Sequence, residues 1–404
     1  MCEIGEYLGI MNTKRALILT CCLGLLTLLL LSVGARAQSL QPIYSFSSPP
    51  ENPQAGLTLG PDGNFYGTTS VGGTGGYGTV FRVTTNGTLT TLVNFTNLNG
   101  AYPTASLTLG PDGNFYGTTA NGGSSGNGTV FQMTTNGTLT TLVNFTNVNG
   151  ADPFVGLTLG PDGNFYGTTS QGGTLNVGTV FQVTTNGTLT TLVNFSNANG
   201  ADPYASLTLG PDGNFYGTTL QGGSSGIGTV FQVTTNGTLT TLVNFTNDNG
   251  AAPYASLTLG PDGSFYGTTA NGGSSGNGTV FQMTTNGSLT TLVNFANLNG
   301  AFPRASLALG PDGNFYGTTS QGGSLNAGTV FQVTTNGTLT TLVNFTSANG
   351  AFPRASLTLG PDGNFYGTTL QGGSGGYGTV FQMTTNGTLS ELAHISQISF
   401  TSRS

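Results

Sequence analysis

Apolar and polar residues alternate in short runs along most of the chain, and turn residues separate the runs. No window shows apolar residues at the 3.6-residue spacing of an amphipathic helix, so we expect almost no helix. Asn86-Gly87 supplies the favoured two-residue hairpin turn, and Pro61-Asp62-Gly63 supplies a second tight turn. The strands expected in the first copy of this pattern are Leu57–Leu59, Asn64–Thr69, Gly78–Thr84 and Leu89–Phe95.

This four-strand pattern repeats every 50 residues. The stretch Pro-Asp-Gly-Asn-Phe-Tyr-Gly-Thr-Thr begins at residue 61 and returns, with Ser264 as its one exception, at residues 111, 161, 211, 261, 311 and 361. A fixed period of this length indicates an array of one supersecondary unit. Four strands in each of seven units predict an all-β protein, a seven-bladed β-propeller, whose blades pack both faces on their neighbours. The alternative is an open β-solenoid, which needs end caps that the chain lacks.

The two ends of the repeat array predict how the ring closes. Residues 40–46 (Leu-Gln-Pro-Ile-Tyr-Ser-Phe) align with the fourth strand at 89–95 but have no blade of their own. The matching strand of the last repeat, Leu389–Ile395, has lost its final aromatic residue. We therefore expect one propeller domain over residues 38–396, closed by the N-terminal strand 40–46, and a disordered tail at 397–404.

The first 37 residues have the pattern of an export signal. The pair Lys14-Arg15 precedes an apolar run over 16–33, and Ala35-Arg36-Ala37 forms a small-x-small cleavage site. Met11 is the expected initiator. An uncleaved membrane anchor is the alternative, because the run approaches the roughly 20 residues that span a bilayer. We expect a secreted or cell-surface protein whose mature chain begins at Gln38 and does not insert into the membrane.

The mature chain is acidic and contains neither lysine nor cysteine. All three cysteines precede residue 38, so no disulfide is expected. Four of the seven basic residues and twelve of the fourteen acidic residues follow that point, which gives a net charge of −8. Nucleic acids and anionic membrane surfaces bind clustered cations. Neither is therefore an expected partner.

The repeat also resembles a known family. Asp62-Gly63-Asn64-Phe65-Tyr66-Gly67-Thr68-Thr69, followed by Gly72-Gly73 and Gly78-Thr79-Val80-Phe81, is similar to the GloVer (Gloeo/Verruco) tandem repeat of exported bacterial proteins. The resemblance extends over all seven repeats and nearly the whole mature chain. It implies an exported bacterial repeat protein with a β-propeller fold, and it implies no particular activity.

Few residues offer catalytic or metal-binding chemistry. His394 is the only histidine, and with no lysine or cysteine the mature chain lacks a Cys/His pair, a Schiff-base lysine and a zinc cluster. Local hydrogen bonding best explains the aspartates of the Pro-Asp-Gly turns, and one carboxylate in each turn is too few for calcium. We therefore expect no catalytic residue, no metal and no cofactor.

Differences among the repeats collect in a Gly-Gly loop, 74–77 in the first copy, and in the loop that links one repeat to the next. Alternate connections of an up-and-down sheet leave at opposite ends, so both loops are expected on one rim, opposite the aspartate turns. Neutral drift between the copies would also produce such differences. The aromatic, acidic and arginine residues beside the linker proline suit binding, with the acids on one side of the rim and the arginines roughly across from them. The candidate binding residues are Tyr102, Asp152, Phe154, Asp202, Tyr204, Tyr254, Phe302, Arg304, Phe352 and Arg354.

These observations favour an exported, non-catalytic repeat scaffold that binds an extracellular glycan or protein through the variable rim. A purely structural cell-surface element is one alternative. A carbohydrate-active propeller enzyme that uses carboxylates is the other, since a carboxylate pair is sufficient for glycoside hydrolysis. Near-identical blades single out no such pair, and Glu51 and Glu391 lie in terminal segments. We therefore do not expect an enzyme.

Overall fold

The structure is a computed structural model that describes residues 50–51, 55–84, 88–360, 362–373 and 379–394. The chain divides into two compact units, 1–41 and 42–404, and every described residue lies in the second. The predicted signal peptide, the strand 40–46 and the tail 397–404 lie outside the described residues, so they stay predictions. The described residues contain no helix that could cross a membrane.

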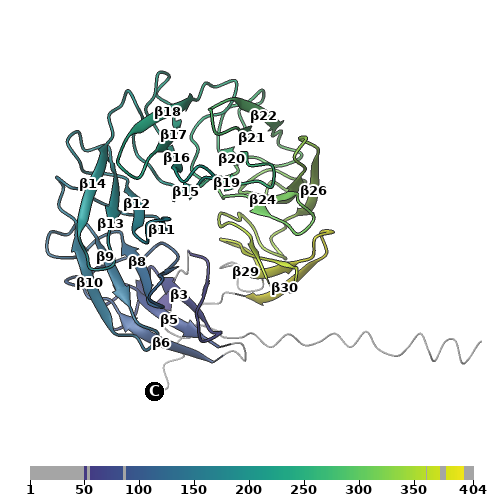
Figure 1. Cartoon of the computed structure of the whole chain (residues 1–404). Coiled ribbons are helices and arrows are strands. Elements are labelled where there is room, and N and C mark those ends of the chain that lie inside the picture. Colours follow the sequence, from purple (N-terminus) through teal and green to yellow (C-terminus); the bar gives the residue numbers. More distant parts are fainter. Residues whose placement is uncertain (1–49, 52–54, 85–87, 361, 374–378, 395–404) are drawn as a thin grey trace, which may run out of the picture. The chain divides into compact units, whose positions relative to one another are not determined.

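Seven four-stranded antiparallel sheets follow one another along the chain (Figure 1). Blade 1 consists of β2 (Thr58–Leu59), β3 (Phe65–Thr69), β5 (Thr79–Val83) and β6 (Leu89–Asn94). Blades 2 and 3 consist of β7 (Thr108–Leu109), β8 (Phe115–Thr119), β9 (Thr129–Met133) and β10 (Leu139–Asn144), and of β11 (Thr158–Leu159), β12 (Phe165–Thr169), β13 (Thr179–Val183) and β14 (Leu189–Asn194). Blades 4 and 5 consist of β15 (Thr208–Leu209), β16 (Phe215–Thr219), β17 (Thr229–Val233) and β18 (Leu239–Asn244), and of β19 (Thr258–Leu259), β20 (Phe265–Thr269), β21 (Thr279–Met283) and β22 (Leu289–Asn294). Blades 6 and 7 consist of β23 (Ala308–Leu309), β24 (Phe315–Thr319), β25 (Thr329–Val333) and β26 (Leu339–Asn344), and of β27 (Thr358–Leu359), β28 (Phe365–Thr368), β29 (Thr379–Met383) and β30 (Leu389–His394). A separate pair joins β1 (Pro50–Glu51) to β4 (Val71–Gly72).

The sheets are arranged around a centre, which confirms the seven-bladed β-propeller and excludes the open solenoid. Strand order within each sheet follows the chain, and the short first strands, such as β11, β15 and β19, lie nearest the centre (Figure 1). The hairpin register is the same from blade to blade. In blade 3, for example, Tyr166 of β12 lies opposite Gln182 of β13.

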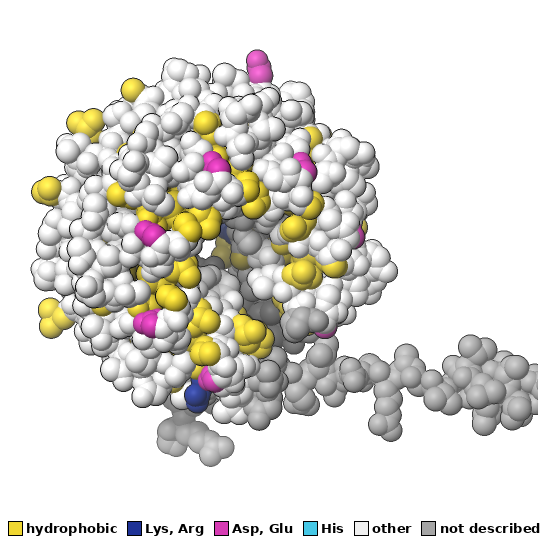
Figure 2. All heavy atoms as spheres, in the orientation of Figure 1, with side chains coloured by type: hydrophobic (Ala, Val, Ile, Leu, Met, Phe, Trp, Pro, Cys, Tyr) yellow, Lys and Arg dark blue, Asp and Glu magenta, His cyan; other side chains and the backbone are white. Residues whose placement is uncertain are grey.

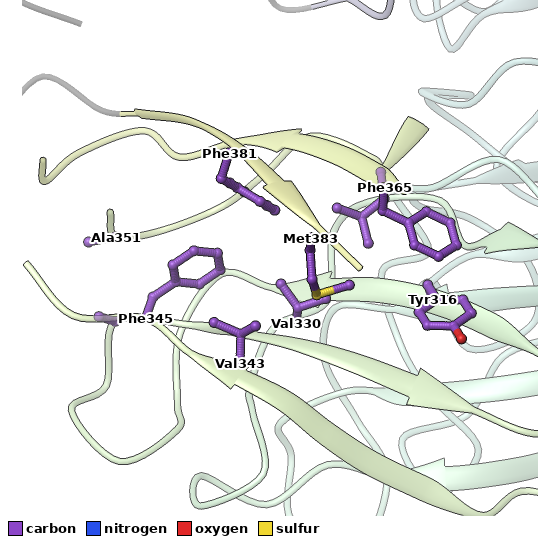
Figure 3. Close-up of a cluster of buried hydrophobic side chains, with 10 residues drawn as sticks. Tyr316, Val330, Val343, Phe345, Ala351, Phe365, Phe381 and Met383 are labelled. Atoms are coloured by element: carbon purple, nitrogen blue, oxygen red, sulfur yellow. The ribbon is translucent and has the colours of Figure 1, made fainter. Parts of the chain in front are cut away.

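The hydrophobic core lies between neighbouring blades. Tyr316 and Phe345 of blade 6 pack against Phe365 and Phe381 of blade 7, and all four side chains are fully buried (Figure 3). The ring centroids are 4.3 Å apart in the Tyr316–Phe365 pair and 5.3 Å apart in the Phe345–Phe381 pair. The equivalent aromatic pairs recur at the other five junctions from blade 1 to blade 6. The sheets of blades 2 to 6 are therefore covered on both faces, which explains why their middle strands are apolar on both sides.

The junction of the last blade with the first is packed differently. A Cβ on Gly56 would lie 3.8 Å from Thr358 Oγ1, so the two blades adjoin. Leu57 is nevertheless 48% exposed, whereas the equivalent Leu107 is 4% exposed. In blade 7, β30 pairs with β29 and occupies the fourth-strand position for which residues 40–46 were the expected occupant. The last repeat thus completes its own sheet.

Candidate functional site

The rim that carries the Pro-Asp-Gly turns, here called the aspartate rim, is built in nearly the same way in every blade. Arg82 replaces the glutamine in blade 1, and Ser264 replaces the asparagine in blade 5. Figure 2 shows acidic side chains distributed around the centre of the ring. In blade 3, Asp162 accepts hydrogen bonds from the backbone N–H and Nδ2 of Asn164 at 3.1 and 2.8 Å. It also accepts bonds from the Tyr166 hydroxyl at 2.8 Å and from Gln182 Nε2 at 3.0 Å. Tyr166 and Gln182 can both reach Asp162 because the strand register pairs them across β12 and β13.

These internal donors determine the charge on the aspartate rim. Burial opposes ionisation of Asp162, but the hydrogen bonds from Tyr166 and Asn164 outweigh it and lower its pKa. Burial and the bond to Asp162 raise the pKa of Tyr166 to about 12. Both oxygens of the carboxylate are thus engaged within the blade. This agrees with the turn role that the sequence favoured for these aspartates.

The opposite rim, here called the linker rim, consists of the Gly-Gly loops and the linkers between repeats. The linker between blades 2 and 3 illustrates it. The Asp152 N–H donates to the Asn127 carbonyl in the loop of blade 2 at 3.1 Å, and the Asp152 carbonyl accepts from the Ser170 N–H of blade 3 at 3.1 Å. The Gly173 N–H donates to the Asn147 carbonyl at 2.8 Å. Each linker therefore binds the loops of both neighbouring blades, which confirms that the two variable loops lie together.

The residue before each linker proline has a left-handed backbone, with φ between 54 and 57°. Non-glycine residues rarely adopt this conformation, which costs of order 1–3 kcal/mol and persists only where the surroundings enforce it. Here the hydrogen bonds to two blades enforce it. The residues concerned are Tyr102, Asp152, Asp202, Ala252, Phe302 and Phe352.

The side chains that follow the linker prolines contact one another from blade to blade. Thr104 Oγ1 donates to the Phe154 carbonyl at 2.8 Å. The rings of Phe154 and Tyr204 stack with centroids 5.5 Å apart. Arg304 Cζ lies over the Tyr254 ring, 5.0 Å from its centroid, which is a cation–π contact. The structure therefore brings together four of the residues that the sequence singled out.

Two acidic side chains adjoin this group. Asp152 and Asp202 are half-buried, and burial raises the pKa of each carboxyl. Burial, the charge of Asp202 and, to a smaller extent, Asp152 and Tyr254 raise the pKa of Tyr204, whereas a hydrogen bond with Ser170 lowers it. Tyr204 and Tyr254 thus connect the acidic residues with Arg304 along the linker rim.

Two further members of the group, Ser170 and Asn121, were missed by sequence reasoning. Ser170 Oγ donates to the Asp152 carbonyl at 3.1 Å, and Asn121 Nδ2 donates to Asp152 Oδ1 at 3.2 Å. The sequence carried a signal for the first of them. The position of Ser170 is serine, alanine or leucine in different repeats, although it follows an invariant strand.

The remaining candidate residues lie elsewhere on the linker rim. Tyr102 is exposed and its ring lies edge-on to Tyr77, with centroids 6.4 Å apart. Phe352 packs against the core between blades 6 and 7. Phe302 is half-buried, and Arg354 is exposed like Arg304. These positions extend the site around the rim.

The protein is thus a seven-bladed β-propeller built from tandem repeats, which differ from one another mainly on the linker rim. The sequence profile of the Gloeobacter/Verrucomicrobia repeat matches residues 31–212, 149–309 and 208–403. The chain belongs to the Gloeobacter/Verrucomicrobia repeat family, which confirms the resemblance seen in its sequence. No curated protein matches the chain.

Among solved structures, the chain is similar to propellers named as lactonases. The periplasmic gluconolactonase of Pseudomonas aeruginosa is 19% identical with a TM-score of 0.54, over 83% of this chain and 94% of that one. A putative 6-phosphogluconolactonase of Bacteroides fragilis is 21% identical with a TM-score of 0.53, over 79% and 90%. Another of Bacteroides uniformis is 20% identical with a TM-score of 0.52, over 78% and 90%. At these identities the likeness establishes the fold alone.

This comparison corrects the expectation of a non-catalytic binding scaffold. The similar structures are named as lactonases, which agrees better with the carbohydrate-active alternative than with a non-catalytic scaffold. The expectation arose because the blades looked equivalent and no carboxylate pair stood out. Burial distinguishes Asp152 and Asp202 from the repeated aspartates, and burial is not visible in the sequence.

Proposed function

We propose that this protein is a hydrolase that acts on a sugar-derived lactone at the linker rim. The observation that carries the proposal is the pair of half-buried carboxylates, Asp152 and Asp202, beside Tyr204. A carboxylate with a raised pKa is a stronger base, and general-base catalysis is most efficient as the pKa approaches the working pH. The names of the similar gluconolactonase structures support the substrate class.

The hydrolysis of a lactone needs a base for water and a hydrogen-bond donor for the ester oxygens. In the proposed reaction the Asp202 carboxylate takes a proton from water while the water oxygen bonds to the lactone carbonyl carbon. The ring C–O bond then breaks, and its oxygen takes that proton to give the open sugar acid. Tyr204, which stays protonated because its pKa is raised, donates to the negative oxygen that forms in between.

Aromatic side chains beside Asp202 provide a surface for the sugar. Phe154 and Tyr204 form a stacked pair, and Tyr254 adjoins Tyr204. Aromatic rings combine a large apolar face with, in tyrosine, a polar hydroxyl. A sugar ring that packs on these faces would keep its hydroxyl groups in water and its lactone group near the carboxylates.

The test is hydrolysis of gluconolactone by the purified full chain, followed as acid release above the spontaneous rate. Asp202→Ala is expected to lower the catalysed rate about 100-fold or more. The variant linker is expected to keep its fold, because residues 199–206 then read Asn-Gly-Ala-Ala-Pro-Tyr-Ala-Ser, which is the natural sequence of 249–256. Asp248→Ala removes a carboxylate from an exposed linker position and serves as the matched control. No turnover, or equal turnover by wild type and Asp202→Ala, would contradict the proposal.

We also propose that residues 1–37 are a signal peptide and that the enzyme acts outside the cytoplasm, in secreted or surface-held form. The pair Lys14-Arg15, the apolar run 16–33 and Ala35-Arg36-Ala37 support it. Expression of the full chain in a bacterium, followed by N-terminal sequencing of the exported protein, should give Gln38 as the first residue. A cytoplasmic product that retains residues 11–37 would contradict export.

A further inference from the structure

The cations of the described residues are unevenly placed. They are Arg82, Arg304 and Arg354, in a chain whose formal net charge is −7. Arg82 lies in β5 beneath the aspartate rim, where it is electrostatically coupled to Tyr66. Arg304 and Arg354 instead occupy equivalent positions in two consecutive linkers, and both are exposed. Positive charge on the linker rim is therefore concentrated in one sector.

The backbones of consecutive linkers run side by side in this sector. The Ser256 N–H donates to Ser306 Oγ at 3.1 Å, and the Ser306 N–H donates to Ser356 Oγ at 3.0 Å. Side chains at the position of the arginines meet across such neighbours, as Phe154 and Tyr204 do. Arg304 and Arg354 thus extend from neighbouring linkers.

We propose that Arg304 and Arg354 hold an anionic group of the substrate, a carboxylate or a phosphate, while the lactone lies near Asp202. This inference rests on the proposed hydrolase function. Guanidinium groups bind oxyanions through paired N–H donors. An arginine that lies over an aromatic ring, as Arg304 lies over Tyr254, keeps its in-plane donors available for such a partner. An anion also relieves the repulsion between two neighbouring cations.

The test measures binding apart from turnover. Calorimetric titration of the full chain would compare glucuronate, glucose 6-phosphate and the neutral sugar glucose, which differ only in the group at the end of the sugar remote from the lactone carbon. Both anions are expected to bind at least about tenfold more tightly than glucose, and more weakly in 0.5 M than in 0.05 M salt. The tighter of the two anions identifies the group that the arginines recognise.

Matched variants locate the binding. Arg304→Thr and Arg354→Thr introduce the residue found naturally at position 104, and each is expected to weaken anion binding about tenfold. Arg354→Lys should recover part of the affinity. Arg82→Gln removes a cation from β5 and restores the glutamine of the other six repeats, so it should leave anion binding unchanged.

The outcomes separate the two proposals. Anion binding that the linker arginines control supports this inference even where gluconolactone is not hydrolysed, and the hydrolase proposal alone then fails. Hydrolysis by a protein that binds glucose as tightly as the anions would overturn the inference and leave the hydrolase proposal in place. The inference would also be overturned if Arg304→Thr and Arg354→Thr lose no more affinity for the anions than Arg82→Gln does.

Discussion

Asp162 on the aspartate rim and Asp202 on the linker rim are the same residue type with opposite pKa shifts. Asp162 receives donors from Asn164, Tyr166 and Gln182, and its pKa is lowered. Burial raises the pKa of Asp202. The repeated aspartate is satisfied by its own blade and serves the scaffold. Asp202, which is not part of the repeated motif, keeps its capacity to take up a proton, and a general base requires this capacity.

Removal of a tyrosine is expected to distinguish the two rims most strongly. Tyr166 is fully buried, its ring centroid lies 4.1 Å from that of Phe215, and its hydroxyl binds Asp162. Tyr166→Ala should lower the free energy of unfolding by about 3–5 kcal/mol. Tyr204→Ala, at a half-buried position on the linker rim, should lower it by about 1 kcal/mol. Urea denaturation of both variants measures the difference, and equal losses would contradict the assignment of the aspartate rim to the scaffold.

A single aspartate of the scaffold rim should matter less. Asp162→Asn weakens the bonds from Tyr166 and Gln182, so we expect a loss of about 1 kcal/mol in the free energy of unfolding. The rate of lactone hydrolysis should not change, because the substitution lies on the rim opposite Asp202. If Asp162→Asn lowers the rate of hydrolysis while the fold is retained, the reaction takes place on the aspartate rim, and the proposed site on the linker rim is wrong.

Acid should change the contributions of Asp162 and Asp202 to stability in opposite directions. The pKa of Asp162 is lowered in the folded protein, so its stabilising contribution is complete above the ordinary value of 3.8 and disappears as the pH falls through the folded-state pKa. The pKa of Asp202 is raised, so its ionisation costs stability as the pH rises above 3.8. Melting temperatures between pH 3 and 6 should fall less steeply with acid in Asp162→Asn than in wild type. They should fall more steeply in Asp202→Ala, and the opposite order would contradict the shifts.

The smallest expected effect concerns backbone strain. The left-handed positions of the aspartate turns are already glycine, as at Gly63 with φ of 75°, whereas the linker position Ala252 has φ of 55°. Ala252→Gly should raise the free energy of unfolding by about 0.5 kcal/mol, because relief of the left-handed strain exceeds the extra entropy of glycine in the unfolded chain. Thermal denaturation tests this, and a lower melting temperature would show that the linker conformation is not strained.

Much of the fold could be predicted because its determinants are local and repeated. The Asn86-Gly87 turn and the Pro61-Asp62-Gly63 turn specify hairpins by backbone chemistry alone. Seven copies at one spacing then specify the number of blades, and the alternation of connections specifies which loops share a rim. The predicted strand boundaries agree with the observed ones to about one residue.

The site could be predicted only in part, since its contacts join residues that lie about 50 positions apart. The sequence by itself determined the scaffold, the varied rim and the residue types offered there, because turns and strand pairing depend on near neighbours. Only the tertiary structure decided that Phe154 stacks on Tyr204, that Arg304 lies over Tyr254, and that Ser170 joins the group. The tertiary structure also decided that the pKa of Asp202 is raised whereas that of Asp162 is lowered. A pKa depends on burial and on the donors within reach, and both exist only once the linkers are held between neighbouring blades.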